Sequence, residues 1–222
     1  MTSDIIVSSD SPVCFVGGGA IGNGQFATDF ANIDCFIGVD GGADHLLYAG
    51  IKPAAVIGDL DSLSDEAAAT FADILCHVAE QDTTDFEKAL MRVSAPLIFA
   101  IGFTGGRIDH MLGVLNVMAR YAQKRVLLVD DADVSFVMMR ALDDLILPAG
   151  TRVALMPLAD VVVSATGLQW SLSDFAMHPV GKTSGSNAAT GEAMNIRTNG
   201  PLLVTVPRAH LQIAATAVVR AE

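Results

Sequence analysis

The protein has 222 residues, 51% of them hydrophobic, and a formal net charge of −12 at pH 7. A chain of this length and composition can bury the core of one large or two small domains, which excludes a disordered protein. The negative charge argues against a nucleic-acid partner, because an acidic surface repels a phosphate backbone. A small phosphate ligand is still compatible with it, provided that a divalent metal or a few basic residues neutralise that ligand locally.

Membrane and export signals are missing from the sequence. No apolar run reaches the roughly 18–20 residues of a membrane span, and the first residues, MTSDIIVSSDSP, lack the basic residues of a signal peptide. Cys14, Cys35 and Cys76 lie in or beside apolar runs without CxxC spacing, which favours buried free thiols. We therefore expect a cytoplasmic protein with no membrane partner.

The first two thirds of the chain alternate between short apolar runs and amphipathic segments. This alternation predicts a parallel sheet that helices cover on both faces. The helix over residues 64–72 has Ser64 as its expected N-cap. The expected strands span residues 13–18, 35–40, 54–58, 74–79, 97–102 and 125–130, and the expected helices span residues 25–32, 43–50, 64–72, 83–94 and 108–121.

The pattern changes near residue 140. Short runs rich in Val, Thr and Ser follow, such as VVVSATGL and PLLVTVP, with turn signals between them. These runs predict a small all-β domain, in the form of a sandwich. The predicted architecture is an α/β domain with a parallel sheet over residues 1–142, followed by a β-sandwich over residues 143–222.

Acidic residues follow several of the predicted strands. Asp40 ends CFIGVD, Asp59 and Asp61 follow AAVIG in the segment GDLDS, and Asp85 lies in QDTTD after the next strand. Ligands of parallel α/β sheets bind outside the carboxyl ends of the strands. Clustered carboxylates repel one another unless a cation lies among them, and hard oxygen ligands favour Mg²⁺. The pattern therefore predicts a magnesium site that includes Asp59, Asp61 and Asp85.

Structural alternatives exist for the same acids. Asp59 and Asp61 also suit a plain turn before a helix. Asp82 and Asp85 also suit an N-cap and a first-turn acid. Lys88 lies three residues after Asp85 and suits either an ion pair or a phosphate contact.

A basic residue precedes the helix expected to begin near Ile108. Arg107 follows Gly105 and Gly106, and an anion between this cation and a helix N-terminus would be stabilised by both. The alternative is that Asp109 caps the helix or pairs with Arg107. We expect His110 to be structural.

Two further features are a glycine-rich loop near the start of the chain and the single tryptophan, Trp170. Residues 17–22, GGGAIG, match the G-x-G-x-x-G dinucleotide fingerprint, but the following Gly22-Asn23-Gly24 is a poor first helical turn. Trp170 suits either a core position or a flat platform for an aromatic heterocycle, with Ser186 and Asn187 as hydrogen-bonding partners.

The ordered segments VDGGADHLL, KPAAVIGDLDS, QDTTDFEKAL, GFTGGRIDHMLGVLN, TGLQW and SGSN together resemble the thiamine pyrophosphokinase family, from about Val39 to Asn187. The resemblance implies an α/β nucleotide-binding domain, a β-sandwich, and a homodimer with active sites at the subunit interface. It also implies transfer of a pyrophosphoryl group from ATP to the hydroxyethyl oxygen of thiamine, giving thiamine pyrophosphate and AMP.

The resemblance also implies roles for individual residues. Asp59, Asp61 and Asp85 would hold Mg²⁺ and the phosphates, with Asp40 in the catalytic cleft, and Asp40 or Asp61 would accept the alcohol proton. The implied nucleotide contacts are Gln81, Lys88, Thr104, Gly105, Gly106, Arg107 and Asp109. The implied thiamine contacts are Trp170, Ser184, Ser186 and Asn187.

Three alternatives to this activity remain at the level of sequence. The first is the same transfer to a pterin alcohol, and the second is a non-catalytic protein that binds thiamine or a nucleotide. The third is an NAD(P) oxidoreductase that uses the Gly17 loop.

Overall fold

The computed structural model describes residues 4–22 and 25–221, so Asn23 and Gly24 of the glycine-rich loop lie outside the described residues. The chain forms two compact units, residues 1–117 with 128–131, and residues 118–127 with 132–222. The second unit begins earlier than the expected boundary at residues 142 and 143. The reason is that β9 (Asp133–Met138) and β10 (Ala141–Ile146) belong to it.

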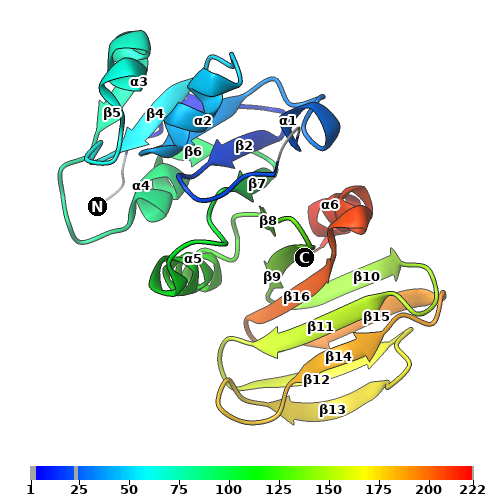
Figure 1. Cartoon of the computed structure of the whole chain (residues 1–222). Coiled ribbons are helices and arrows are strands. Elements are labelled where there is room, and N and C mark those ends of the chain that lie inside the picture. The colour runs from blue at the N-terminus through cyan, green and yellow to red at the C-terminus, as the bar shows by residue number, and fades with distance from the viewer. Residues whose placement is uncertain (1–3, 23–24, 222) are drawn as a thin grey trace. The chain divides into compact units, whose positions relative to one another are not determined.

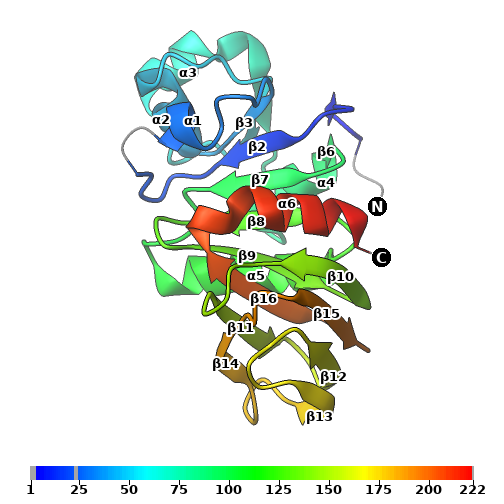
Figure 2. The same ribbon diagram turned by 90° about the vertical axis from the view of Figure 1, so that its right-hand side faces the viewer.

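The first unit contains a parallel sheet in the order β7-β2-β3-β4-β5 (Figures 1 and 2). In its register Cys14 lies opposite Phe36 on one side and Phe99 on the other. A short parallel pair, β1 (Val7–Ser8) with β6 (Val93–Ser94), lies apart from it. The sheet strands are β2 (Val13–Val16), β3 (Phe36–Val39), β4 (Ala55–Gly58), β5 (Leu75–His77) and β7 (Ile98–Ile101).

All four residues of β2, β3, β4 and β7 are buried, as expected for strands covered on both faces. Ala43, Val56, Ala67 and Phe71 form a core cluster from two helices and β4. Ser64 caps α3, because its hydroxyl accepts a hydrogen bond from the Ala67 amide at 3.1 Å. The helices are α1 (Gln25–Thr28), α2 (Gly42–Tyr48), α3 (Asp65–Thr70), α4 (Asp85–Arg92) and α5 (Ile108–Arg120), with a 3-10 turn, η1 (Ala72–Ile74).

Close backbone packing fixes the first turn of α2. A Cβ atom on Gly42 would lie 1.8 Å from the carbonyl oxygen of Val16, so only glycine fits there. This contact brings the end of β2 against the start of α2, immediately after Asp40. The loop that carries Asp40 is therefore held by the sheet itself.

The second unit consists mainly of two antiparallel sheets, visible as two layers in Figure 1. One sheet has the order β10-β15-β12-β13 and the other has β14-β11-β16-β9. Burial alternates along β9, β11 and β12, so each of these strands buries one face only. The remaining strands are β11 (Arg152–Pro157), β12 (Val161–Thr166), β13 (Leu172–Met177), β14 (Ser184–Ala188), β15 (Ala193–Thr198) and β16 (Leu202–Pro207), and β8 (Val126–Val129) lies where the chain passes between the units.

The prediction of an all-β second domain is wrong at its end. After a 3-10 turn, η2 (Arg208–His210), the chain forms α6 (Leu211–Arg220), which packs on β10. The segment LQIAATAVVR is rich in alanine, a strong helix former. Its buried residues, Leu211, Ala214, Ala215, Ala217 and Val218, follow helical spacing. The second unit is therefore β-rich with a covering helix.

Two other expectations concern the membrane and the thiols. Within residues 4–22 and 25–221, no helix combines the length and apolar character needed to cross a bilayer. Cys14, Cys35 and Cys76 are free thiols, but only Cys14 is fully buried, and the other two are partly exposed. Burial raises the pKa of all three thiols.

Candidate functional site

Neighbouring parallel strands bring three aspartates together. Asp40 directly follows β3, and Asp59 and Asp61 follow β4, its neighbour in the sheet. One carboxylate oxygen from each of the three lies within 4.8 Å of the others. We call Asp40, Asp59 and Asp61 the carboxylate group. Its formation follows from the parallel pairing, because both strands end at the same edge of the sheet.

The backbone around the carboxylate group is held in an unusual conformation. Asp40 has a φ of 48° and Leu60 has a φ of 63°, both in the left-handed region. Such a conformation costs of order 1–3 kcal/mol for a residue other than glycine, and it persists where the surrounding structure enforces it. Gly58 is required here as well, since a Cβ atom on it would lie 2.9 Å from the Asp40 Cβ. The close packing of Gly58 against Asp40 therefore holds the end of β4 beside Asp40.

Ser62, which sequence reasoning did not select, ties the carboxylate group together. Its hydroxyl donates to Asp61 Oδ1 at 2.9 Å, and its amide donates to Asp40 Oδ1 at 3.4 Å. The only sequence signal for a role of Ser62 is its place at the end of the GDLDS segment. Burial raises the pKa of Asp40, and the nearby charge of Asp85 adds to this effect, despite opposing hydrogen bonds from Gly41 and Ser62.

A buried lysine lies beneath this group. Lys88 on α4 has a side chain that is 1% exposed, and its Nζ lies 3.0 Å from Asp85 Oδ1 and 3.4 Å from Asp59 Oδ2. Desolvation alone would lower the pKa of Lys88, but the hydrogen bonds and charges of Asp85 and Asp59 outweigh it and raise that pKa. Of the two predicted roles for Lys88, the structure displays the ion pair.

Asp59 accepts hydrogen bonds from several sides. Gln81 Nε2 donates to Asp59 Oδ2 at 3.2 Å, and the Asp61 amide donates to Asp59 Oδ1 at 3.4 Å. Burial alone would raise the pKa of Asp59, but these bonds, with the charge of Lys88, outweigh burial and lower it. Asp59 is therefore held as a carboxylate.

Asp85 lies beside the carboxylate group rather than within it. Its Oδ1 accepts from the Asp59 amide at 3.1 Å and from Lys88 at 3.0 Å. The suggestion of Asp82 as N-cap of this helix is wrong. The cap is Thr84, whose hydroxyl accepts from the Glu87 amide, whereas the Asp82 amide donates to Glu80 within the preceding loop.

The chemistry of the carboxylate group suits a divalent cation. Three carboxylates whose oxygens lie within 4.8 Å of one another carry more negative charge than the one buried ammonium beside them can neutralise. All the donors are hard oxygens, which Mg²⁺ prefers. The structure groups Asp40 with Asp59 and Asp61, whereas the sequence predicted Asp85 as the third member of the metal site.

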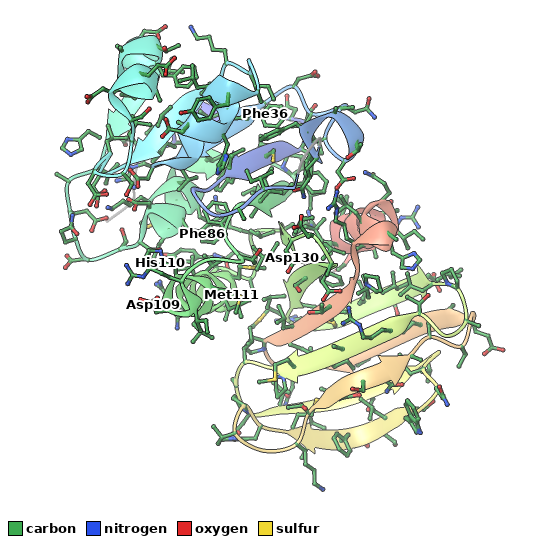
Figure 3. All side chains as sticks on the ribbon, in the orientation of Figure 1. Phe36, Phe86, Asp109, His110, Met111 and Asp130 are labelled. Carbon is green, nitrogen blue, oxygen red and sulfur yellow. The ribbon has the colours of Figure 1, made fainter. Side chains whose placement is uncertain are left out.

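The loop after β7 carries the predicted phosphate-binding residues. Gly105, with a φ of 76°, and Gly106 lead to Arg107 just before α5, as predicted. Arg107 Nε and Nη2 donate to the two oxygens of Asp109, at 3.1 and 2.5 Å, and this exposed pair raises the pKa of Arg107 and lowers that of Asp109. Figure 3 shows Asp109 and His110 at the start of α5. Thr104 in the same loop is half-buried, and His110 is exposed.

The Gly17 loop has a packing reason for its glycines. A Cβ atom on Gly17 or Gly19 would lie 2.6 or 2.7 Å from the carbonyl oxygen of Gly102. Residues 20–22 lie outside any helix, and the next helix described is α1 (Gln25–Thr28). Among the described residues this loop therefore does not lead directly into a helix, as a dinucleotide fingerprint would require.

In the second unit, Trp170 lies at the surface and is 57% exposed, so it is not a core residue. Ser184, Ser186 and Asn187 lie on β14, the strand that faces the Trp170 segment. Ser184 is half-buried, Ser186 is exposed and Asn187 is buried. Asn187 forms hydrogen bonds with the backbone of Trp170 and with Ser184 Oγ, so these three predicted residues come together.

Fold and site thus define an α/β protein with an acidic group at the ends of parallel strands, joined to a β-rich unit that presents an exposed tryptophan. Comparison with known proteins supports a specific family. The family model "Thiamin pyrophosphokinase, catalytic domain" matches residues 26–129, and "Thiamin pyrophosphokinase, vitamin B1 binding domain" matches residues 144–203.

Individual relatives agree with the family models. Thiamine pyrophosphokinase 3 of Oryza sativa subsp. japonica is 29% identical over 72% of this chain and 67% of its own length. Thiamine pyrophosphokinase 1 of Arabidopsis thaliana is 30% identical over 70% of this chain and 65% of its own length. The chain thus spans about two thirds of these plant relatives.

A solved structure agrees as well. Thiamin pyrophosphokinase from Geobacillus thermodenitrificans superposes with a TM-score of 0.74 at 28% identity, covering 88% of this chain and 96% of its own. The chain belongs to the thiamine pyrophosphokinase family. The resemblance inferred from the sequence segments is confirmed.

Proposed function

We propose that this protein is an ATP-dependent diphosphotransferase that converts thiamine and ATP to thiamine pyrophosphate and AMP. The observation that carries this proposal is the carboxylate group at the ends of β3 and β4, inside the region matched by the catalytic family model. A protein that only bound thiamine would not need three facing carboxylates. In this proposal the first unit binds ATP and the second binds thiamine.

Asp59 and Asp61 are the proposed ligands of Mg²⁺, which usually takes one or two carboxylates and leaves its other positions to water and phosphate oxygens. The ion would neutralise charge on the transferred phosphates. Asp85 supports this pair, since it accepts from the Asp59 amide and from Lys88. Lys88 is proposed to hold Asp59 and Asp85 in place through its ion pairs with them. The phosphates would add their negative charge to that of these two carboxylates.

In the reaction, the hydroxyethyl oxygen of thiamine attacks the β-phosphorus of ATP. A new O–P bond forms, the bond from that phosphorus to the AMP oxygen breaks, and AMP leaves with that electron pair. The hydroxyl proton passes to a carboxylate. Asp40 is proposed for this role, because burial raises its pKa and a carboxylate with a raised pKa is a better general base.

The residues proposed to position the nucleotide come from two regions, one formed by Gln81 and α4 and the other by the loop after β7 and the first turn of α5. Arg107 would supply fixed positive charge to the phosphates, and it can do so only by sharing or leaving its bond with Asp109. The glycines before it let phosphate oxygens approach the backbone. The full proposed set is Gln81, Lys88, Thr104, Gly105, Gly106, Arg107 and Asp109.

The indole of Trp170 is proposed to stack on an aromatic ring of thiamine, because it is a large flat surface that remains exposed. Ser184 and Ser186 would supply hydrogen bonds at the edge of this platform. We further propose a cytoplasmic homodimer with active sites at the subunit interface. Sedimentation velocity would test the dimer, and a single species at the monomer mass would refute it.

Product analysis with ATP, Mg²⁺ and thiamine tests the proposed reaction. Metal-dependent formation of thiamine pyrophosphate and AMP, lost in Asp59→Asn, is the expected result. Formation of ADP and thiamine monophosphate would contradict the proposed attack at the β-phosphorus. Release of AMP with a pterin alcohol, but no turnover of thiamine, would retain the transfer and reject thiamine as the acceptor.

A further inference from the structure

Asn187, on β14, has a carboxamide whose hydrogen-bonding capacity is fully used within the protein. The residue is 3% exposed. Its Oδ1 accepts from the Trp170 amide at 3.2 Å and from the Ala188 amide at 2.9 Å. Its Nδ2 donates to the Trp170 carbonyl at 2.8 Å and to Ser184 Oγ at 3.2 Å. A carboxamide offers two acceptor sites and two donor hydrogens, so none remains for a ligand.

These bonds continue a pattern of backbone pairing. The Trp170 segment runs antiparallel to the chain after Asn187, with a bridge between Leu168 and Ala189. The Thr190 amide donates to the Gly167 carbonyl at 3.0 Å, and the Gln169 amide donates to the Ala188 carbonyl at 2.8 Å. Beyond this point the Asn187 side chain, rather than a backbone group, bonds both the N–H and the C=O of Trp170.

The start of the segment is fixed independently. Gly167 has a φ of 73°, and a Cβ atom on it would lie 2.6 Å from the Ala193 carbonyl oxygen. The backbone is therefore anchored at Gly167 by close packing and at Trp170 by Asn187. Trp170 itself is 57% exposed, so packing of its side chain does little to orient the indole.

We propose that Asn187 is a positioning residue that clamps the backbone of Trp170 and so presents its indole to the substrate. This role replaces the direct thiamine contact predicted for Asn187. It rests on the proposed function only in the identity of the stacked ligand. The clamp itself follows from the contacts above, whatever that ligand is.

The single tryptophan of the chain makes this inference directly testable. Steady-state fluorescence anisotropy reports the mobility of Trp170 in the free protein, and thiamine quenching of the same signal reports binding. The test variant is Asn187→Ala. The matched control is Asn195→Ala, since Asn195 in the same unit also accepts from a backbone amide, that of Asp144, and donates to a backbone carbonyl, that of Ala193.

Asn187→Ala should lower the anisotropy of Trp170 and raise both the Kd and the KM for thiamine about tenfold, because binding must then order the freed Trp170 segment. The KM for ATP should be unchanged, as should all these quantities in Asn195→Ala. Unchanged anisotropy in a folded Asn187→Ala protein would overturn the clamp. Lower anisotropy without any quenching of the wild type by thiamine would support the clamp and refute the role proposed for Trp170.

A second measurement does not depend on the variant folding. Amide hydrogen exchange of the wild-type protein, resolved by NMR, should show the Trp170 amide protected to a similar degree as that of Gln169, which donates to a backbone carbonyl. Exchange of the Trp170 amide at the rate of an unstructured peptide would overturn the proposal.

Discussion

The carboxylate group and the Trp170 segment differ in how fully their charged and polar groups are neutralised or paired. In the carboxylate group, three acids face one another with a single buried ammonium beside them, and the backbone at Asp40 and Leu60 is strained. At Trp170 the polar groups are matched one to one by Asn187, and the side chain that remains exposed is apolar. The first site is electrostatically incomplete and the second is complete.

This difference indicates how each site should respond to change. An incomplete charged site gains stability when a cation binds, because binding to the folded state alone shifts the unfolding equilibrium. A complete site gains little from ions and depends on geometry instead. Mutations in the carboxylate group should therefore affect turnover and metal response, whereas those around Trp170 should affect substrate affinity.

The largest effect is expected from Asp59→Asn, which removes a charge from the carboxylate group without changing its shape. If Asp59 is the proposed metal ligand, its loss should remove several kcal/mol of stabilisation of the transferred phosphates, so kcat should fall about a thousandfold. Steady-state assays of AMP release measure it. Asp73→Asn, at an exposed acid paired with Lys52, is the control and should leave kcat unchanged. A fall of less than threefold in Asp59→Asn would remove Asp59 from the site.

Trp170→Ala should act on affinity instead. Removing an exposed ring leaves the fold intact, but loss of stacking and of buried apolar area should raise the KM for thiamine about tenfold. The KM for ATP should stay the same, and Tyr48→Ala, at another exposed aromatic residue, is the control. Equal changes in both KM values would mean that the two regions are not functionally distinct.

Lys88→Met tests the ion pairs beneath the carboxylate group. Removing one partner of a fully buried pair costs about 3–5 kcal/mol. The carboxylates here keep partial exposure, 16% for Asp59 and 29% for Asp85, so solvent screening should reduce the loss in free energy of unfolding to about 2 kcal/mol. Chemical denaturation measures this loss, and added Mg²⁺ should recover more of it than added Na⁺. Lys52→Met, at an exposed pair, should show no measurable change.

The smallest effect concerns pH. The folded protein holds the pKa of Asp59 below its ordinary value, so the stability from this pairing is present above the unfolded pKa of about 3.9 and is lost as pH falls through the folded pKa. The difference in unfolding free energy between wild type and Lys88→Met should therefore be constant from pH 7 to about pH 5 and shrink below about pH 4. Denaturation curves across this range measure it. A difference that grew on acidification would contradict the assigned pairing.

Much of the first unit could be predicted from sequence because its signals are local. Apolar runs of the right length marked β2, β3, β4 and β7, and the cap at Ser64 followed from one hydroxyl before an acidic turn. The acids that follow the strands could be placed at one edge, because parallel strands end together. The second unit was predicted less well from the sequence. It begins before the expected boundary at residues 142 and 143. The helical spacing of the alanine-rich segment that forms α6 was not recognised.

The sequence by itself determined which residues follow which strands, and six ordered segments were enough to indicate the family. Only the tertiary structure decided which side chains meet. The register of β3 against β4 places Asp40 with Asp59 and Asp61, the position of α4 buries Lys88 against two carboxylates, and antiparallel pairing sets Asn187 opposite Trp170. The physical reason is separation along the chain. Hydrophobic periodicity depends on residues a few positions apart, so it can be read from the sequence. These hydrogen bonds and ion pairs join residues far apart in the chain and form only once strand register fixes their distances.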